Sequence, residues 1–309
     1  MADKIATREA YGKALVELGK KYDNLVVMDA DLSGSTKTAM FAKEYPERFF
    51  NMGIAEQNMY GAAAGLAVSG KIVCASTFAM FAAGRAFEII RNSIGYTHAN
   101  VKICATHAGI TVGEDGATHQ TFEDIALMRT IPGMTVINPS DGISTAKLLE
   151  KAMELDGPCY VRLGRSAVPV FYDDNADFEI GRGKTLRKGS DAAIIATGIM
   201  VNEAMIAAEE LSKQNIDVRV IDIHTIKPID QDIIIKAAKE TGAIVTAEEH
   251  SVIGGLGSAV AEVTAAYAPA KMKLVGQHDV FGESGKPEEL KQKYNMTAAD
   301  IVKAVRELI

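Results

Sequence analysis

Tryptophan is absent from this 309-residue sequence, cysteine occurs only three times, and no apolar run is long enough to cross a membrane. A membrane-spanning helix needs about 20 consecutive apolar residues, and the opening segment MADKIATREAYGKAL carries charges where a signal peptide needs an apolar stretch. The cysteines, Cys74, Cys104 and Cys159, lie scattered in apolar surroundings without a C-x-x-C pair. Their spacing argues against a disulfide framework and against a cysteine zinc site. We therefore expect a cytoplasmic protein with reduced thiols.

The sequence also lacks a surplus of basic residues. It contains 33 Lys and Arg against 40 Asp and Glu, which gives a net charge of −7, and no long run of one sign occurs. Sequence-independent binding of nucleic acid depends on dense Lys and Arg side chains, so the charge argues against that function. Apolar residues make up 48% of the chain, and its length allows two domains that each bury a core.

Short β-branched segments alternate with amphipathic segments along almost the whole chain, which is typical of β-α units on a parallel sheet. In the first half we expect strands at 24–29, 71–77, 101–106, 134–138 and 159–163, and helices near 7–20, 55–68, 82–97, 121–129 and 142–155. In the second half we expect strands at 192–197, 217–223, 243–249 and 272–277, and helices near 200–213, 230–240, 256–266 and 298–307. Ser140-Asp141 is a suitable N-cap for the helix near 142–155, and Thr297 with Asp300 fits a capping box for the helix near 298–307.

These elements predict an α/β fold with two domains, each a largely parallel β-sheet flanked by helices. Residues 164–191 have no clear periodicity and mix Gly, Pro and charged residues. We therefore place a first domain at 1–166, a linker at 167–189 and a second domain at 190–309.

Polar residues gather where several predicted strands end. Asp31 and Ser35 follow the strand at 24–29, His107 follows the strand at 101–106, and Arg165 follows the strand at 159–163. In an open parallel sheet, ligands bind beyond the carboxyl ends of the strands. The pattern predicts a pocket for an oxygen-rich, anionic ligand.

The segment THAGITVGEDGATHQ, residues 106–120, is too polar for a core and too rich in glycine for a regular helix. Its two imidazoles, His107 and His119, lack the compact spacing of a metal site such as H-x-x-x-H, and no cysteine is near. This spacing argues against a metal site without excluding it, and an acid–base site, a phosphate clamp and a plain polar loop also remain open from this segment alone.

Glu56, Phe78 and Phe81 each have a structural and a functional interpretation. Glu56 stands near the start of a predicted helix, where its charge favours the helix dipole. The small residues that follow, such as Gly61 and Gly65, permit close approach of another subunit, and a buried acid there could share a proton with a ligand nitrogen. Phe78 and Phe81, three residues apart, fit a hydrophobic core or a flat wall for an aromatic ring.

Together, several motifs resemble the transketolase family. NMGIAEQNM, STFAMFAAGRAFEIIR, THAGITVGEDGATHQ, IPGMTVINPSDG and VRLGRSAVP resemble its pyrimidine-binding domain, in this order along the chain. GSDAAIIATG, VIDIHTIKPID and AEEHSVIGGLGSAVAEV resemble its carboxy-terminal domain. The Gly-Asp-Gly motif with a following Asn, with which transketolases bind Mg²⁺ and diphosphate, is absent.

The resemblance implies the carboxy-terminal subunit of a split transketolase. The cofactor would be thiamine diphosphate, held between this chain and a separate amino-terminal subunit that ligates Mg²⁺. The implied assembly is a homodimeric core within a heterotetramer, and the implied reaction transfers a two-carbon ketol unit from a ketose phosphate to an aldose phosphate.

The resemblance also assigns residues to the cofactor. Glu56 matches the acid that hydrogen-bonds the pyrimidine ring nitrogen, and Phe78 and Phe81 match the aromatic wall beside that ring. Asp31 matches an acid beside the cofactor cleft. Where some members carry a third aromatic residue, this chain has Gly84, and the neighbouring Arg85 would reshape that side of the pocket.

Six residues match positions that contact the sugar phosphate. Arg8 and Arg165 match the arginines that clamp the phosphate, for which the planar guanidinium is suited, and Ser35 matches a hydroxyl partner in that clamp. His107 matches a substrate-binding imidazole, Asp115 a carboxylate that contacts an acceptor hydroxyl, and His119 an acid–base imidazole near the substrate carbonyl.

Four other functions compete with this interpretation. 1-Deoxyxylulose-5-phosphate synthase shares some of the motifs but lacks the leading imidazole and the Glu-Asp pair of the 106–120 segment. A 2-oxoacid dehydrogenase subunit uses the same cofactor, but its substrates carry no sugar phosphate. A non-catalytic regulatory subunit would be expected to have lost Glu56 or the arginine clamp. A nucleotide-binding module would rely on the glycine-rich turn at 253–260, where a helix N-terminus could hold an anion.

Overall fold

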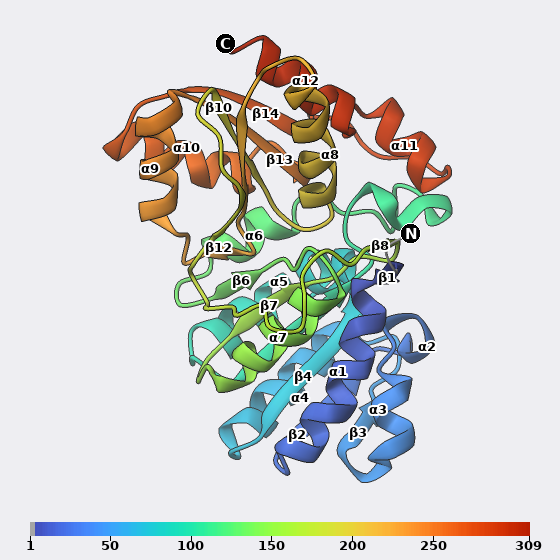
Figure 1. Ribbon diagram of the computed structural model, residues 1–309. Coiled ribbons are helices and arrows are strands. Elements are labelled where there is room, and N and C mark those ends of the chain that lie inside the picture. Colours follow the sequence, from blue (N-terminus) through green and yellow to red (C-terminus); the bar gives the residue numbers. More distant parts are fainter. Residues whose placement is uncertain (1–3) are drawn as a thin grey trace.

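Two mostly parallel β-sheets, each covered by helices, form the computed structural model, which describes residues 4–309 (Figure 1). The sheets belong to two domains stacked one above the other. This arrangement confirms the predicted α/β class, although the first three residues of the predicted first domain lie outside the described range.

The first domain contains a seven-stranded sheet with the order β12-β6-β7-β5-β4-β2-β3. Its strands are β2 (Leu25–Asp29), β3 (Phe49–Asn51), β4 (Ile72–Phe78), β5 (Val101–Thr106), β6 (Thr135–Ile137), β7 (Cys159–Arg162) and β12 (Thr225–Lys227). All neighbours are parallel except β12, which runs antiparallel to β6. Every residue of β2, β4 and β5 is buried, as expected for strands with helices on both faces.

The helices of the first domain follow most of the predicted positions. They are α1 (Thr7–Lys21), α2 (Ser33–Thr36), α3 (Ala39–Glu44), η1 (Pro46–Arg48), α4 (Glu56–Val68), η2 (Phe81–Arg85), α5 (Phe87–Ile89), η3 (Ile90–Gly95), η4 (Ile110–Asp115), α6 (Asp124–Thr130) and α7 (Gly142–Glu154). The predicted cap of α7 is confirmed, because Asp141 accepts a hydrogen bond from the backbone N–H of Ser144. The predicted helix at 82–97 is instead divided, with the π-helical segments η2 and η3 on either side of α5.

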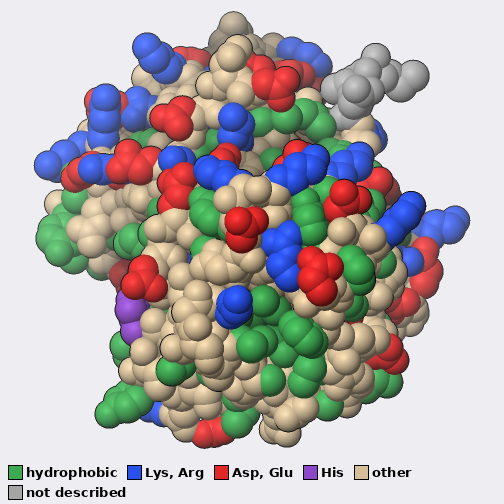
Figure 2. Space-filling model, turned by 90° about the horizontal axis from the view of Figure 1, so that it is seen from below, with side chains coloured by type: hydrophobic (Ala, Val, Ile, Leu, Met, Phe, Trp, Pro, Cys, Tyr) green, Lys and Arg blue, Asp and Glu red, His purple; other side chains and the backbone are tan. Residues whose placement is uncertain are grey.

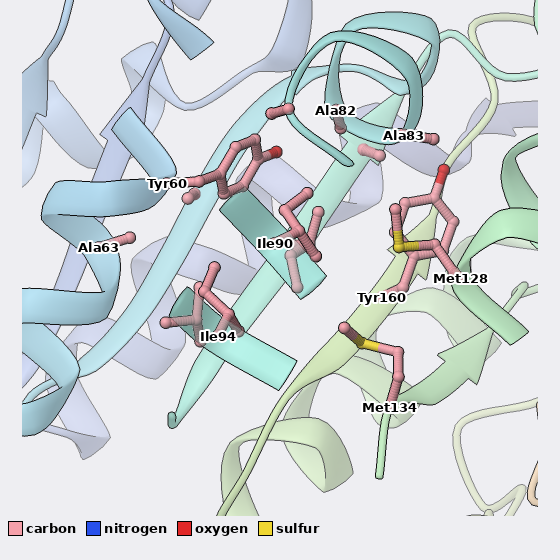
Figure 3. Close-up of a cluster of buried hydrophobic side chains, with 14 of the residues drawn as sticks. Tyr60, Ala63, Ala82, Ala83, Ile90, Ile94, Met128, Met134 and Tyr160 are labelled. Atoms are coloured by element: carbon pink, nitrogen blue, oxygen red, sulfur yellow. The ribbon is translucent and has the colours of Figure 1, made fainter. Parts of the chain in front are cut away.

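The core of the first domain lies between the sheet and these helices (Figure 3). Tyr60 and Ala63 from α4, Ile90 and Ile94 from η3 and Tyr160 from β7 pack in one cluster. The π-helical turn at η3 places both isoleucines against the sheet with no exposure. Apolar burial of this extent stabilises the domain by roughly 25 cal/mol for each Å² removed from water.

The second domain contains a five-stranded sheet with the order β14-β13-β10-β11-β9. Its strands are β9 (Lys184–Arg187), β10 (Ala192–Ala196), β11 (Val218–Asp222), β13 (Ala243–Ser251) and β14 (Lys271–Gln277), and its helices are α8 (Met200–Ser212), α9 (Gln231–Thr241), α10 (Leu256–Tyr267), α11 (Pro287–Lys293) and α12 (Ala298–Arg306). Successive residues of β10 face opposite layers, Ile194 toward α8 and α12 and Ile195 toward α9 and α10. The predicted cap of α12 at Thr297 is confirmed by a capping box.

The predicted linker at 167–189 contains two short strands. β8 (Ala167–Pro169) pairs antiparallel with β1 (Lys4–Ala6), and β9 pairs antiparallel with β11. Both strands are short and lie in a segment without clear periodicity, so no alternating pattern predicts them.

Each domain contributes residues to the sheet or the core of the other. β12 lies in the sequence of the second domain but forms an edge of the first sheet, and Ile226 on it joins the first core. In return, Ile110 and Phe122 from the first domain lie in the core of the second. The boundary that we place at 190 therefore does not separate two independent cores.

On the face shown in Figure 2, at the first-domain end of the molecule, Lys and Arg side chains are interspersed with Asp and Glu. Within residues 4–309, no helix has both the length and the hydropathy needed to span a bilayer.

Candidate active site

The residues predicted for the site lie where the strands of the first sheet end. β2, β4, β5 and β7 are parallel, so their carboxyl ends share one edge. Phe78 is the last residue of β4, and His107 directly follows β5. Glu56 opens α4 just after β3, and Arg8 lies in the first turn of α1, where its backbone N–H donates to the carbonyl of Gly164 beyond β7 (3.3 Å).

Two phenylalanines and two histidines form an aromatic group at this edge. The rings of Phe78 and Phe81 are nearly parallel, with centroids 6.1 Å apart and an interplanar angle of 11°. His107 stacks on Phe78 at 3.8 Å, while His119 meets the edge of Phe81 at 5.4 Å. Residues 41 positions apart in sequence, from β4 and from the 106–120 segment, therefore share one wall.

Glu56 is buried beside this aromatic group and paired with a cation. Its side chain is 1% exposed, and Arg85 Nη1 donates to Glu56 Oε2 at 3.0 Å. The Arg85 guanidinium also lies 4.9 Å from the centroid of Phe81. The π-helical turn of η2 brings Arg85 to this position, so Arg85 connects the acid to the aromatic wall.

Arg8 and His107 contact each other from different elements. Arg8 Nη1 donates to the backbone oxygen of Ser35 (2.8 Å) and lies 3.4 Å from His107 Nε2. Because arginine only donates, His107 Nε2 is the acceptor, and its Nδ1–H donates to Thr106 Oγ1 at 2.9 Å. Arg8 Nε is buried, and the described residues provide it with no acceptor. Such a donor is suited to an anionic ligand.

His107 is held in its neutral form. Its side chain is 2% exposed, and burial, with the positive charges of Arg8 and Arg165, lowers the pKa of His107 to about 3. A neutral imidazole at this place can exchange hydrogen bonds with a sugar hydroxyl without adding charge to the arginines.

Arg165 and Asp115 lie farther out. Arg165 Nη1 donates to Glu114 at 2.9 Å and to the backbone oxygen of Val112. Asp115, next to Glu114, is exposed. The segment folds as the short helix η4 between Gly109 (φ 82°) and Gly116 (φ 76°), which adopt backbone angles that favour glycine.

Asp31 is exposed at the margin of the site, where Asn51 Nδ2 donates to Asp31 Oδ1 at 2.9 Å. Its neighbour Asp29, to which we assigned no role from sequence, is fully buried and organises the following turn. The carboxylate of Asp29 accepts from the Leu32 backbone (2.5 Å), Thr36 (2.6 Å) and Thr38 (2.9 Å). Asp29 thus holds the turn that carries Ser35, and an Asp followed by clustered hydroxyl residues is the signal that could have revealed it.

The contacts around Glu56, Phe78 and Phe81 fit a planar, nitrogen-containing ring. The glycine-rich turn at 253–260 fits a nucleotide less well. A buried carboxyl beside a near-parallel aromatic pair suits a heterocycle that carries a protonated nitrogen. In the 253–260 turn, the backbone N–H groups of Leu256 and Gly257 already donate to the Glu248 carboxylate, at 2.6 and 2.7 Å, and so are not free for an anion. Within 4–309, no group of three or more His, Cys, Asp or Glu forms a potential metal site.

Comparisons with known proteins identify both domains. Residues 3–170 match the family model of the transketolase pyrimidine-binding domain, and residues 181–301 match that of the transketolase C-terminal domain. A putative transketolase C-terminal section from Methanocaldococcus jannaschii is 56% identical, with 97% of this chain and 95% of that protein covered. Human transketolase is 39% identical over all of this chain, which spans 50% of its length.

Solved structures agree with these matches. A chain described as a split gene transketolase, inactive β4 tetramer, superposes with a TM-score of 0.93 at 57% identity and covers 98% of each chain. Transketolase from Leishmania mexicana superposes with a TM-score of 0.85 at 28% identity, covering 100% of this chain and 46% of that one. A 6-deoxy-6-sulfo-D-fructose transketolase subunit from Clostridium is 42% identical over 97% of this chain and 94% of its own. The chain therefore belongs to the transketolase family and contains its pyrimidine-binding and C-terminal domains.

Proposed function

We propose that this chain is the carboxy-terminal subunit of a split transketolase, which transfers a two-carbon ketol unit from a ketose phosphate to an aldose phosphate. The proposal rests chiefly on one observation, the meeting of buried Glu56, the Phe78–Phe81 pair and the two histidines of 106–120 at one edge of the sheet. The similarity to a protein named as a transketolase C-terminal section supports it.

Glu56, Phe78 and Phe81 would hold the pyrimidine ring of thiamine diphosphate, with Asp31 at the rim of the same cleft. When bound, this cofactor would supply the stabilised carbanion that breaking and forming carbon–carbon bonds requires. Glu56 would share a proton with a ring nitrogen, and to do so it would have to exchange its contact with Arg85 for one with the ring. We place Mg²⁺ on the amino-terminal subunit.

Arg8, Arg165 and His107 would bind the phosphorylated sugar. Arg8 Nε has no acceptor among the described residues, and Arg165 could exchange the exposed Glu114 for a phosphate. Neutral His107 would orient a hydroxyl. His119 would hold or release a proton at the substrate carbonyl oxygen, and exposed Asp115 would accept a hydrogen bond from the acceptor sugar. The Ser35 hydroxyl stays a predicted partner of the phosphate, because the observed contact of Arg8 is with its backbone oxygen.

The active species would be a heterotetramer with a homodimeric core of this chain and two amino-terminal subunits. The split gene transketolase chain described as an inactive β4 tetramer supports the expectation that this chain alone lacks activity.

The decisive test is ketol transfer by the purified chain with its amino-terminal partner, thiamine diphosphate and Mg²⁺. Glu56→Gln should lower kcat by at least about a hundredfold, because proton transfer by a positioned acid contributes about 10²- to 10⁴-fold. Glu47→Gln, at a side chain that is 68% exposed, is the matched control and should keep wild-type turnover.

The same assay separates the competing functions. A 1-deoxyxylulose-5-phosphate synthase or 2-oxoacid dehydrogenase subunit would turn over pyruvate, while a regulatory subunit would leave the rate unchanged when Glu56 is replaced. Either result, or full activity of the chain without a partner, would contradict the proposal.

A further inference from the structure

Hydrogen bonds attach the 106–120 segment to the second domain. Thr111 N–H donates to Glu249 Oε1 of β13 (2.6 Å), and Gln120 Nε2 donates to the backbone oxygen of Glu283 (2.9 Å). Just beyond the segment, Ser251 N–H donates to the oxygen of Phe122 (2.9 Å). Ile110 also packs in the second core, and α11 lies beside η4 (Figure 1). The segment that carries both histidines therefore depends on the second domain for its shape.

Glu249 is the charged side chain at the centre of this attachment. It is 3% exposed, and Arg162 Nη2 fixes its backbone by donating to the Glu249 carbonyl at 2.9 Å. Its carboxyl group fills the space beside Gly109, since a Cβ at Gly109 would lie 2.3 Å from Glu249 Cδ. Gly109 and the Thr111 amide thus form a close-fitting seat for this one carboxylate.

The two histidines of the same segment contact the aromatic pair formed by Phe78 and Phe81. His107, two residues before Gly109, stacks on Phe78, and His119 meets Phe81. A shift of the backbone at 109–111 would move His107 away from Phe78 and from Arg8. Glu249 is the second-domain side chain that hydrogen-bonds the backbone of this segment nearest His107, at Thr111, whereas the contacts from Glu283 and Ser251 lie at its far end.

We propose that Glu249 is a positioning residue, which fixes the 106–120 segment through the Thr111 amide and thereby sets the affinity for the sugar phosphate. The inference rests on the proposed function of His107 and His119 in binding that substrate. It assigns to the second domain a specific task, to hold the substrate-binding segment in its binding conformation.

The neighbouring Glu248 provides a matched control. It lies on the same strand and is fully buried, but its carboxylate accepts from Leu256 and Gly257 at the start of α10, away from the segment. A purely structural role of buried glutamates on β13 would make the two residues equivalent.

The test compares Glu249→Met and Glu249→Gln, which have similar volumes but differ in whether they can accept the Thr111 N–H. In the chain alone, hydrogen exchange at 106–120 should become at least about tenfold faster in Glu249→Met and stay near wild type in Glu249→Gln. In the assembled enzyme, Glu249→Met should raise KM for the ketose phosphate at least about tenfold, with a smaller change in kcat and unchanged affinity for thiamine diphosphate. Glu248→Gln should lower Tm without changing either readout.

Unchanged exchange at 106–120 in Glu249→Met would overturn the inference, as would an equal effect of Glu248→Gln. If the wild-type assembly transferred no ketol unit, only the proposed function would fail, because the exchange experiment needs no substrate and would still decide whether Glu249 holds the segment.

Discussion

At the scale of single residues, His107 shows how burial sets a protonation state. Its imidazole is enclosed by Phe78, Arg8 and Thr106, and its pKa is lowered to about 3. The unfolded chain would bind a proton at this residue near pH 6.5. The folded chain therefore binds fewer protons than the unfolded chain between pH 6.5 and 3, and its stability falls as the pH falls through this window.

His107→Gln should remove the part of this dependence that His107 contributes, while buried His224 and His250, whose pKa values are lowered to about 4, keep their own parts. From pH 6.5 to 5, the free energy of unfolding of the wild type should fall by about 1.7 kcal/mol more than that of the variant, because the slope reaches about 1.4 kcal/mol per pH unit only once the unfolded imidazole is fully protonated. Urea unfolding at fixed protein concentration measures the difference, with the exposed His278→Gln as the control. Parallel curves for wild type and His107→Gln would contradict the burial of a neutral imidazole.

Sequence reasoning located part of the site because strand ends in a parallel sheet share one edge. Phe78 ends β4 and His107 follows the adjacent β5, so their proximity follows from the order of the strands. The ion pair between Arg85 and Glu56 depends on the π-helical turn at η2, which no periodic pattern signals. The seat of Glu249 joins residues 138 positions apart in two domains, so only tertiary packing reveals it.

At the scale of elements, one side of α4 has no covering layer within the described chain. Ile54, just before the helix, is 77% exposed and Val68 at its end is 78% exposed. Between them, a Cβ added at Gly61 or Gly65 would meet no atom within 4 Å. A small-residue face of this kind permits the close approach of a second helix, which agrees with the homodimeric core that we propose.

Gly61→Gln should have opposite effects on folding and on association. Replacing glycine within a helix stabilises it by roughly 0.5–1 kcal/mol, while the longer side chain would separate two α4 helices. We expect a raised Tm for the dissociated chain and at least about a tenfold weaker self-association in sedimentation equilibrium, from loss of about 1.4 kcal/mol. Lys239→Gln, at an exposed position of α9, is the control. Unaltered association would exclude α4 from the contact.

The longer elements and the three-residue strand β6 were predictable from sequence, whereas the other three-residue strands were not. β2, β4 and β5 consist entirely of buried residues, most of them apolar, and their predicted positions are confirmed to within one residue. β1, β3, β8 and β12 have three residues each, and their extended form depends on partner strands rather than on their own pattern.

At the scale of the whole molecule, a buried ionic network joins the domains. Asp124 of α6 accepts from Arg162 Nε and Tyr160, each at 2.7 Å, and His250 of β13 lies 3.9 Å away. Asp124 is fully buried and Arg162 is 3% exposed. Because Arg162 also donates to the Glu249 carbonyl, the network supports the same interface as the seat of Glu249.

Asp124→Leu should cost about 3–5 kcal/mol of unfolding free energy, because Arg162 would remain buried without a counter-charge. The double variant Asp124→Leu with Arg162→Met should recover a large part of the loss, since it removes both charges. Glu154→Gln, which breaks an exposed pair with Lys151, should change stability by less than about 1 kcal/mol. Denaturant unfolding followed by circular dichroism checks all three, and a double variant no more stable than the single one would contradict this account.

Strand β12 has a practical consequence for anyone who divides this protein. A fragment that ended near residue 190 would lose the partner of β6 and leave its N–H and C=O groups open along one margin of the sheet. Such a fragment would tend to aggregate through this unpaired strand edge. The complementary fragment, from about residue 190 onward, would contain β12 without its partner strand. The two halves of this polypeptide are thus structurally interdependent, and we do not expect either half to fold as an independent unit.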